Sequence, residues 1–125
     1  MARFRPRQRL RKAAEFDRVF RRGVRLDGAL FVLVAASNDG AHDRLGLAVS
    51  RRVGGSVVRN RVRRLLRESF RCLERGARAS ADLVILGKPE LARASLEDVG
   101  RELRARVGRL ERGSGRGRTR PAPAR

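Results

Sequence analysis

Residues 46–71, GLAVSRRVGGSVVRNRVRRLLRESFR, decide the fold, because they join a short apolar run to a long arginine-rich segment across two glycines. The apolar run, residues 45–49, is typical of a buried strand. Ser56 then offers an N-cap for a helix that we expect to reach about Glu74, with Gly76 as its stop. The stretch therefore predicts a strand, a tight turn and an amphipathic helix, in that order.

The helix has two different sides when successive residues are placed about 100° apart. Its apolar side consists of Val58, Val62, Leu65, Leu66, Ser69 and Leu73. Its polar side consists of Arg59, Asn60, Arg63, Arg64, Arg67 and Arg71. Four of these arginines follow one another at i, i+4 spacing, where each like-charge pair costs a few tenths of a kcal/mol. A bridging anion removes that cost, so the polar side favours phosphate binding over a simple solvated face.

Two further elements are expected on the N-terminal side of this stretch. Residues 29–36, ALFVLVAA, are apolar throughout and are followed by turn residues, which indicates a strand. Together with residues 45–49 this strand predicts an antiparallel hairpin. Before it, AAEFDRVFRRG (13–23) has apolar residues at helical spacing and ends on a glycine. This pattern predicts a short helix with a left-handed stop at Gly23.

A strand and a helix are expected on the C-terminal side. Residues 81–86, ADLVIL, are typical of a core strand, and the glycine and proline that follow end it. A helix start follows at Ser95, and the apolar residues after it have helical spacing: Leu96, Val99, Leu103, Val107 and Leu110. The order helix, strand, strand, helix, strand, helix predicts an α+β fold, a single two-layer sandwich domain.

One domain is expected over residues 13–110, since a chain of 125 residues suits a single core. Residues 1–12 form a basic N-terminal arm, which either stays mobile or docks on the domain. Residues 111–125 are rich in Gly, Pro and Arg without apolar periodicity, so we expect a disordered basic tail.

The charge of the chain indicates a polyanionic partner, because 32 Lys and Arg against 13 Asp and Glu give a formal net charge of +19. Nucleic acid and an anionic membrane are the candidates. No run approaches the roughly 18 apolar residues of a membrane span, and the basic N-terminus lacks a signal-peptide core. We therefore expect a cytoplasmic nucleic-acid-binding protein, without a disulfide because it has one cysteine, and no membrane partner.

No residue pattern indicates catalytic residues or a metal site in the protein itself. His42 is next to Asp43, but neighbouring side chains rarely converge and no nucleophile is marked by spacing. Cys72 borders the apolar side of the long helix and is expected to be a core or boundary residue. The carboxylates are interleaved with arginines, which is typical of ion pairs on helix surfaces, as at Glu68, Glu74, Glu97 and Glu102.

Residues 46–71, with their Arg-Asn-Arg core at 59–61, resemble the signature of the bacterial ribonuclease P protein subunit. The flanking segments KAAEFDRVFRRG (12–23), FVLV (31–34) and DLVILGKP (82–89) agree in kind and order. The resemblance covers most of the chain apart from its two ends, and it implies a left-handed crossover through the basic helix where general handedness rules predict a right-handed one.

The resemblance also implies a function. Ribonuclease P removes the 5′ leader of precursor tRNA by phosphodiester hydrolysis, and in bacteria its catalytic centre and Mg²⁺ ions belong mainly to an RNA subunit. The chain would then be the accessory protein subunit of an RNA-catalysed endoribonuclease, with no catalytic residues of its own. Its partners would be the ribonuclease P RNA and precursor tRNA, with no protein partner required.

Two sets of residues match the functional positions of that family. Those that match its motif for contacting the catalytic RNA are Arg59, Asn60, Arg61, Arg63, Arg64 and Arg67, with Arg51 and Arg52 before them. We add Arg71 to the predicted RNA-contacting residues because it lies on the polar side of the helix. The leader would bind in a cleft between the first helix and the sheet, at Lys12, Phe16, Phe20, Phe31 and Leu33, with Leu47 and Val49 possible. Strand register, which decides which side chains face the cleft, is open at this point.

Two other classes of protein fit part of the pattern. A structural RNA-binding protein, such as a ribosomal protein, would share the charge and the small α+β fold. A DNA-binding module is disfavoured because no helix-turn-helix spacing appears. Stimulation of leader removal by a ribonuclease P RNA distinguishes the accessory subunit from a structural RNA-binding protein.

Overall fold

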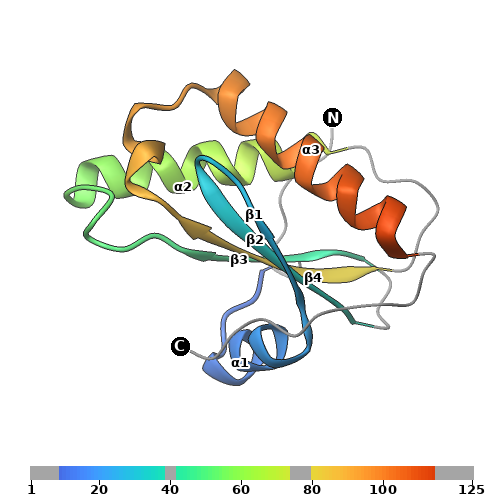
Figure 1. Ribbon diagram of the computed structural model, residues 1–125. Coiled ribbons are helices and arrows are strands. Elements are labelled where there is room, and N and C mark those ends of the chain that lie inside the picture. The colour runs from blue at the N-terminus through green and yellow to red at the C-terminus, as the bar shows by residue number, and fades with distance from the viewer. Residues whose placement is uncertain (1–8, 39–41, 74–79, 115–125) are drawn as a thin grey trace.

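A single four-stranded sheet with helices on both faces forms the protein. The computed structural model describes residues 9–38, 42–73 and 80–114. Its elements are α1 (Ala13–Arg22), β1 (Val24–Asp27), β2 (Phe31–Ser37), β3 (Arg44–Ala48), α2 (Ser56–Arg71), β4 (Ala81–Gly87), the 3₁₀ helix η2 (Pro89–Arg93) and α3 (Leu96–Ser114). Figure 1 shows α2 and α3 on one face of the sheet and α1 on the other. The α+β class is confirmed, and α1 adds a thin third layer to the two predicted.

The sheet has the order β1-β2-β4-β3, which differs from the predicted hairpin. β2 pairs antiparallel with both β1 and β4, whereas β3 pairs parallel with β4. The predicted pairing of β2 with β3 is therefore wrong, because β4 lies between them. β2 forms its hairpin with β1, a four-residue strand that was not predicted because VRLD is short and half charged. The continuous apolar runs of β2 and β4 fit their central places, where both faces are buried.

The connection from β3 to β4 passes through α2. Parallel neighbours cannot be joined by a tight turn, so a long crossover is required, and α2 supplies it. The left-handed sense that the family resemblance implies stays a prediction.

The core has two parts because successive strand residues face opposite sides of the sheet. The larger part lies between the sheet and the helices α2 and α3, and it includes Phe31, Leu33, Leu83, Ile85, Val62, Leu66, Val99 and Leu103. The smaller part lies under α1 and includes Leu10, Val19, Val32, Val34, Ala36 and Val84. The register of β2 and β4 thus decides which side chains reach α1 and which reach α2.

The limits of α2 differ slightly from the prediction. Gly55, not Ser56, is the N-cap, and the helix ends at Arg71 with Cys72 as its C-cap. The predicted end near Glu74, and the stop at Gly76, lie outside the described residues.

Gly23 has a different role from the one predicted. Its φ of −84° is an extended conformation, so it is not a left-handed stop. A β-carbon at this position would lie 2.5 Å from the carbonyl oxygen of Val19 and 2.8 Å from Cγ1 of Val34. The glycine therefore permits the end of α1 to approach the sheet closely.

Glu102 links α3 to the turn between β1 and β2 through hydrogen bonds. Its carboxylate accepts hydrogen bonds from the backbone N–H groups of Ala29, Leu30 and Phe31 at 3.2, 2.9 and 3.1 Å. The prediction that Glu102 belongs to a surface ion pair is therefore wrong. The prediction is confirmed for Glu68 and Glu97, which pair with arginines on their own helices, whereas Glu74 lies outside the described residues.

The described part of the N-terminal arm docks on the domain. The N–H of Leu10 donates to the carbonyl oxygen of Leu45 at 2.9 Å, and Arg9 forms a parallel bridge with the same residue. Residues 9–12 thus follow the outer edge of β3. At the other end α3 continues to Ser114, beyond the predicted boundary at 110. Residues 1–8 and 115–125, which complete the predicted arm and tail, lie outside the described residues.

Candidate nucleic-acid interface

α2 carries positive charge along almost its whole outer side. Its sequence has six arginines and one acid, Glu68. The predicted apolar side is confirmed, since Val62, Leu66 and Ser69 are buried and Val58, Leu65 and Leu73 pack against the larger core. Phe70 joins them as a buried residue that the helical projection had not placed there. The arginines of the polar side form a surface that is mainly positive, interrupted by Glu68, which pairs with Arg71.

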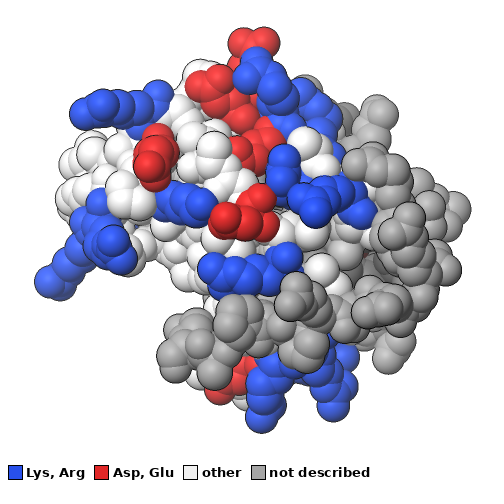
Figure 2. Space-filling view, viewed as in Figure 1, with Lys and Arg blue, Asp and Glu red and all other residues white. Residues whose placement is uncertain are grey.

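The charge pattern of α3 is different. In Figure 2 the acidic side chains of the visible face gather mainly around α3 and the neighbouring end of the sheet, where they alternate with basic ones. On α3 itself, Arg101 lies 3.8 Å from Glu97 and 3.5 Å from Asp98. Alternating positive and negative side chains of this kind are typical of an ordinary solvent-exposed helix surface. Compared with α3, α2 leaves more of its positive charge for an external anion.

The start of α2 adds a second feature that suits an anion. Arg51 and Arg52 are exposed in the turn before it, and the first turn of the helix contains no acid. Gly54 has φ +158°, at the edge of the left-handed region, and no atom would lie within 4 Å of a β-carbon on Gly55. Gly55 and Ser56 are exposed, so this helix end faces solvent, and the helix dipole is positive there.

The Arg-Asn-Arg motif is only partly free for a ligand. Arg61 donates from Nη1 to the carbonyl oxygen of Ala92 at 3.1 Å and from Nη2 to that of Ala94 at 3.0 Å. It therefore ties α2 to the end of η2. Asn60 accepts a hydrogen bond from Arg63 at 3.0 Å. The family motif predicted that these residues contact RNA. Their hydrogen bonds within the protein depend on the fold, so the spacing of residues in the sequence could not reveal them.

Arg67 lies where the basic surface of α2 meets the docked arm. Burial lowers the pKa of its guanidinium, and the nearby charges of Arg9 and Arg63 lower it further. Three cations so placed oppose one another, and an anion between them would relieve that repulsion. Arg59, Arg63 and Arg71 are half-buried like Arg67, whereas Asn60, Arg61 and Arg64 are exposed.

A partly exposed apolar strip lies on the opposite face of the sheet. Phe16, Phe20 and Leu86 pack against the smaller core but remain half-exposed, and Ala48 is exposed on the same face. Lys12 is exposed one helical turn before Phe16. We call Phe16, Phe20, Leu86 and Ala48 the α1 strip. It brings together Phe16 and Phe20, two of the three aromatic residues of the predicted leader site.

The other predicted members of that site do not lie on the α1 strip. Phe31 and Leu33 have no exposed surface and pack in the larger core, under α2 and α3. Leu47 and Val49 also face that core. The α1 side is formed instead by their neighbours Val32 and Val34. Because β2 is apolar on both faces, its sequence has no alternation from which the register could be predicted.

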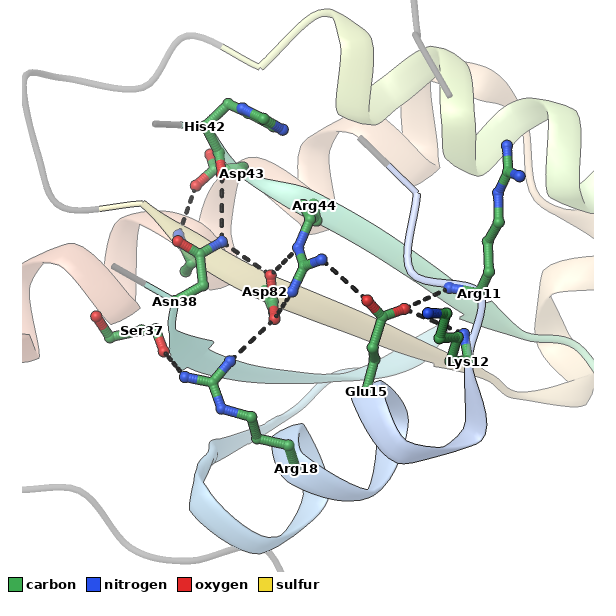
Figure 3. Close-up of polar contacts among 11 residues, drawn as sticks. Arg11, Lys12, Glu15, Arg18, Ser37, Asn38, His42, Asp43, Arg44 and Asp82 are labelled. Atoms are coloured by element: carbon green, nitrogen blue, oxygen red, sulfur yellow. Dashed lines mark hydrogen bonds and ion pairs between the residues drawn. The ribbon is translucent and has the colours of Figure 1, made fainter. Parts of the chain in front are cut away.

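A polar network joins α1 to three strands (Figure 3). At its centre Asp82, whose side chain is 1% exposed, accepts two hydrogen bonds of 2.8 Å from Arg44 and one of 2.8 Å from Asn38. Arg18 lies 3.6 Å from Asp82 and donates to the Ser37 carbonyl oxygen at 3.3 Å. Burial opposes the ionisation of Asp82, but its bonds with Arg44 and Asn38 and the charges around it outweigh burial and lower its pKa. The sequence had suggested only an apolar strand here.

Acid should destabilise the protein through this network. Hydrogen bonds from the backbone of Arg11 and Lys12, with the charge of Arg44, lower the pKa of Glu15, as the network lowers that of Asp82. A carboxyl group with a lowered folded pKa stabilises the fold above its unfolded pKa, and loses that contribution as the pH falls through the folded value. The ordinary values are 4.5 and 3.8, so the free energy of unfolding should fall below about pH 4.5. Urea unfolding at a series of pH values measures this, and a flat profile would contradict it.

His42, Cys72 and the carboxylates do not gather into another site among the residues that the structure describes. The carbonyl oxygen of His42 accepts a hydrogen bond from Asn38 at 3.2 Å. Cys72 is exposed, which corrects the predicted core or boundary position. Over residues 9–38, 42–73 and 80–114, no three His, Cys, Asp or Glu side chains lie close enough together to hold a metal ion. In the same part of the chain, no helix has both the length and the apolar character that crossing a bilayer requires.

The fold and this charge distribution define a small, strongly basic α+β protein with one arginine helix. Comparisons with known proteins identify the family. A family model described as Ribonuclease P matches residues 4–111. The ribonuclease P protein component of Brevibacillus brevis is 40% identical over 96 residues, which cover 76% of both chains. That of Syntrophobacter fumaroxidans is 40% identical over 105 residues, which cover 83% of this chain and 88% of the relative.

Solved structures agree. The RNase P protein of Thermotoga maritima matches with a TM-score of 0.70 and 29% identity, over 83% of this chain and 96% of that one. The Staphylococcus aureus protein, at 24% identity, shows the same fold with a TM-score of 0.74, over 83% of this chain and 95% of that one. The chain belongs to the bacterial ribonuclease P protein family.

Proposed function

We propose that the chain is the protein component of ribonuclease P and assists the endonucleolytic removal of the 5′ leader from precursor tRNA in the cytoplasm. In this proposal the basic side of α2 binds the catalytic RNA, and the α1 strip binds the leader. The observation that carries the proposal is the polar side of α2, which bears five of the six arginines of a helix with one acid, in a chain of this family. Such a surface neutralises phosphates and releases their counterions.

The two surfaces suit two different kinds of RNA contact. α2 and the α1 strip lie on opposite faces of the sheet (Figure 1). Arginines arranged along a helix match the phosphates of a folded RNA without reading its bases. Half-exposed phenylalanines, by contrast, offer flat apolar surfaces on which the bases of a single strand can stack. A leader is single-stranded, so the α1 strip is the surface that fits it.

The protein's part in the reaction is to bind and orient. Mg²⁺, held mainly by the RNA, would supply the activation of water and the stabilisation of the leaving oxygen. The chain's arginines would hold the catalytic RNA, and Phe16 and Phe20 would hold the leader beside the cleavage site. We assign no proton transfer to any residue of the chain.

Phe20→Ala tests the leader site. With the catalytic RNA bound, this variant should bind precursor tRNA about tenfold more weakly, because stacking of one base on an aromatic ring contributes about 1–3 kcal/mol. Its affinity for mature tRNA, which has no leader, should be unchanged. Equilibrium binding of both RNAs to the reconstituted enzyme measures the two affinities.

Leu96→Ala is the matched control, because Leu96 is an exposed apolar residue on α3, 45% exposed and outside both proposed surfaces. It should leave both affinities as they are in the unaltered protein. Equal losses for precursor and mature tRNA in Phe20→Ala would remove the α1 strip from the leader site. Loss of the fold in Phe20→Ala would instead assign the ring to the core.

A further inference from the structure

α1 packs on the sheet through only three apolar side chains, Val19, Phe16 and Phe20. Val19 is its only buried residue, while Phe16 and Phe20 are half-exposed. Its N-cap is Lys12, whose backbone N–H donates to the carboxylate of Glu15 at 3.1 Å, as in a capping box. Polar contacts must therefore contribute much of what fixes the position of this helix.

Those contacts form one connected path from the sheet to the arm (Figure 3). Asp82 on β4 holds the guanidinium of Arg44 on β3. Arg44 donates from Nη1 to Oε2 of Glu15 at 3.0 Å. The other oxygen of Glu15 accepts from the backbone N–H groups of Arg11 and Lys12 at 3.0 and 3.1 Å. One carboxylate thus joins the start of α1 and the docked arm to a buried acid in the sheet.

The path ends beside the α1 strip. Phe16 follows Glu15 directly, and its ring lies on the backbone of β3, where a β-carbon on Gly46 would be 2.7 Å from Cζ. Arg44, Gly46 and Ala48 lie on one face of β3, because strand residues alternate. A shift of Glu15 along this face would therefore move Phe16 relative to Ala48, and would move Lys12 with it.

We propose that Glu15 and Arg44 are positioning residues for the leader of precursor tRNA. They fix the start of α1 and residues 11–12 against β3, and so set where Phe16 and Lys12 meet the single strand. This inference rests on the proposed function of the α1 strip. The pair also stabilises the fold, because Arg44 holds the buried Asp82, so the test separates the two roles by their effects on precursor and mature tRNA.

Glu15→Ala tests the proposal, with Glu97→Ala as its matched control. Both glutamates lie in the first turn of a helix and both pair with an arginine, but Glu97 is on α3 and its side chain is 81% exposed. In the reconstituted enzyme, Glu15→Ala should raise KM for precursor tRNA about fivefold, the lower end of typical coupling between sites. It should leave kcat and the affinity for mature tRNA unchanged. Glu97→Ala should behave like the unaltered protein.

Amide hydrogen exchange of the free protein gives a readout that does not depend on activity. The Arg11 and Lys12 amides, which donate to Glu15, should exchange faster in Glu15→Ala than in Glu97→Ala. Arg44→Lys keeps the charge but loses the fork geometry, so it should raise KM in the same direction by a smaller factor. It also serves as the second variant if Glu15→Ala does not fold.

The outcomes separate the two proposals. Equal KM values for Glu15→Ala and Glu97→Ala, in an enzyme that prefers precursor to mature tRNA, would overturn the positioning role. Unchanged amide exchange at residues 11 and 12 would overturn it as well. If the unaltered enzyme showed no preference for precursor over mature tRNA, the leader site itself would fail, and the positioning role with it.

Discussion

Replacing Asp82 with asparagine is expected to lower the free energy of unfolding by about 3 kcal/mol, the low end of what breaking a buried ion pair costs. The side chain of Asp82 is 1% exposed and is held by Arg44, Asn38 and Arg18. Asparagine has nearly the same shape, so little packing is lost. Its amide group, however, places a donor where an arginine also donates. It also removes the negative charge that faces Arg18 and Arg44, so that Glu15 is left as the carboxylate partner of Arg44.

Urea unfolding at neutral pH measures this effect. Glu97→Gln removes one negative charge from an exposed ion pair, so it controls for the change in net charge and should alter stability by less than about 0.5 kcal/mol. Asp82→Asn should also flatten the fall in stability below about pH 4.5. A loss no larger than that of Glu97→Gln would show that the network does not hold α1 on the sheet.

The double variant Arg63→Ala, Arg67→Ala is expected to bind ribonuclease P RNA roughly 100-fold more weakly at low salt, because two phosphate contacts are lost. The slope of log affinity against log salt concentration should decrease by about two units, since each contact contributes about one. The fold should persist, since Val62 and Leu66 carry the packing of α2 against the core.

Arg101→Ala, Arg104→Ala is the matched control. It removes two exposed arginines from α3, where Arg101 has acidic neighbours, and so produces the same change in net charge. Equilibrium binding over a range of salt concentrations should show a much smaller loss and little change in slope. Equal effects in the two double variants would mean that overall charge, and not the surface of α2, binds the RNA.

The elements that have strong local patterns could be predicted from the sequence. The 3.6-residue periodicity of α2 and α3 is a local property, so the helices and the buried side of α2 were predicted from single segments. The apolar runs of β2 and β4 marked them as strands, and the sheet order then gave them their central places. β1 was missed because a four-residue strand with two charges has no comparable pattern.

The residues that depend on pairing between distant segments could not be predicted. Phe31 and Leu33 were placed in the leader site, but the register of β2 turns them toward α2 and α3. Asp82 begins an apolar strand in the sequence, and only the fold brings Arg44 and Asn38 to it. Glu102 likewise has a helix-surface pattern, although it binds the backbone of a turn more than seventy positions earlier. Local spacing contains no information on such contacts.

Cleavage of precursor tRNA at low magnesium is the most direct test of the central claim, that the chain assists an RNA catalyst. We expect a bacterial ribonuclease P RNA to work poorly alone under these conditions, because few cations screen its phosphates against those of the substrate. Adding the purified protein should stimulate accurate removal of the 5′ leader, and Arg63→Ala, Arg67→Ala should require a higher concentration for the same rate. No stimulation by the folded protein would contradict the account.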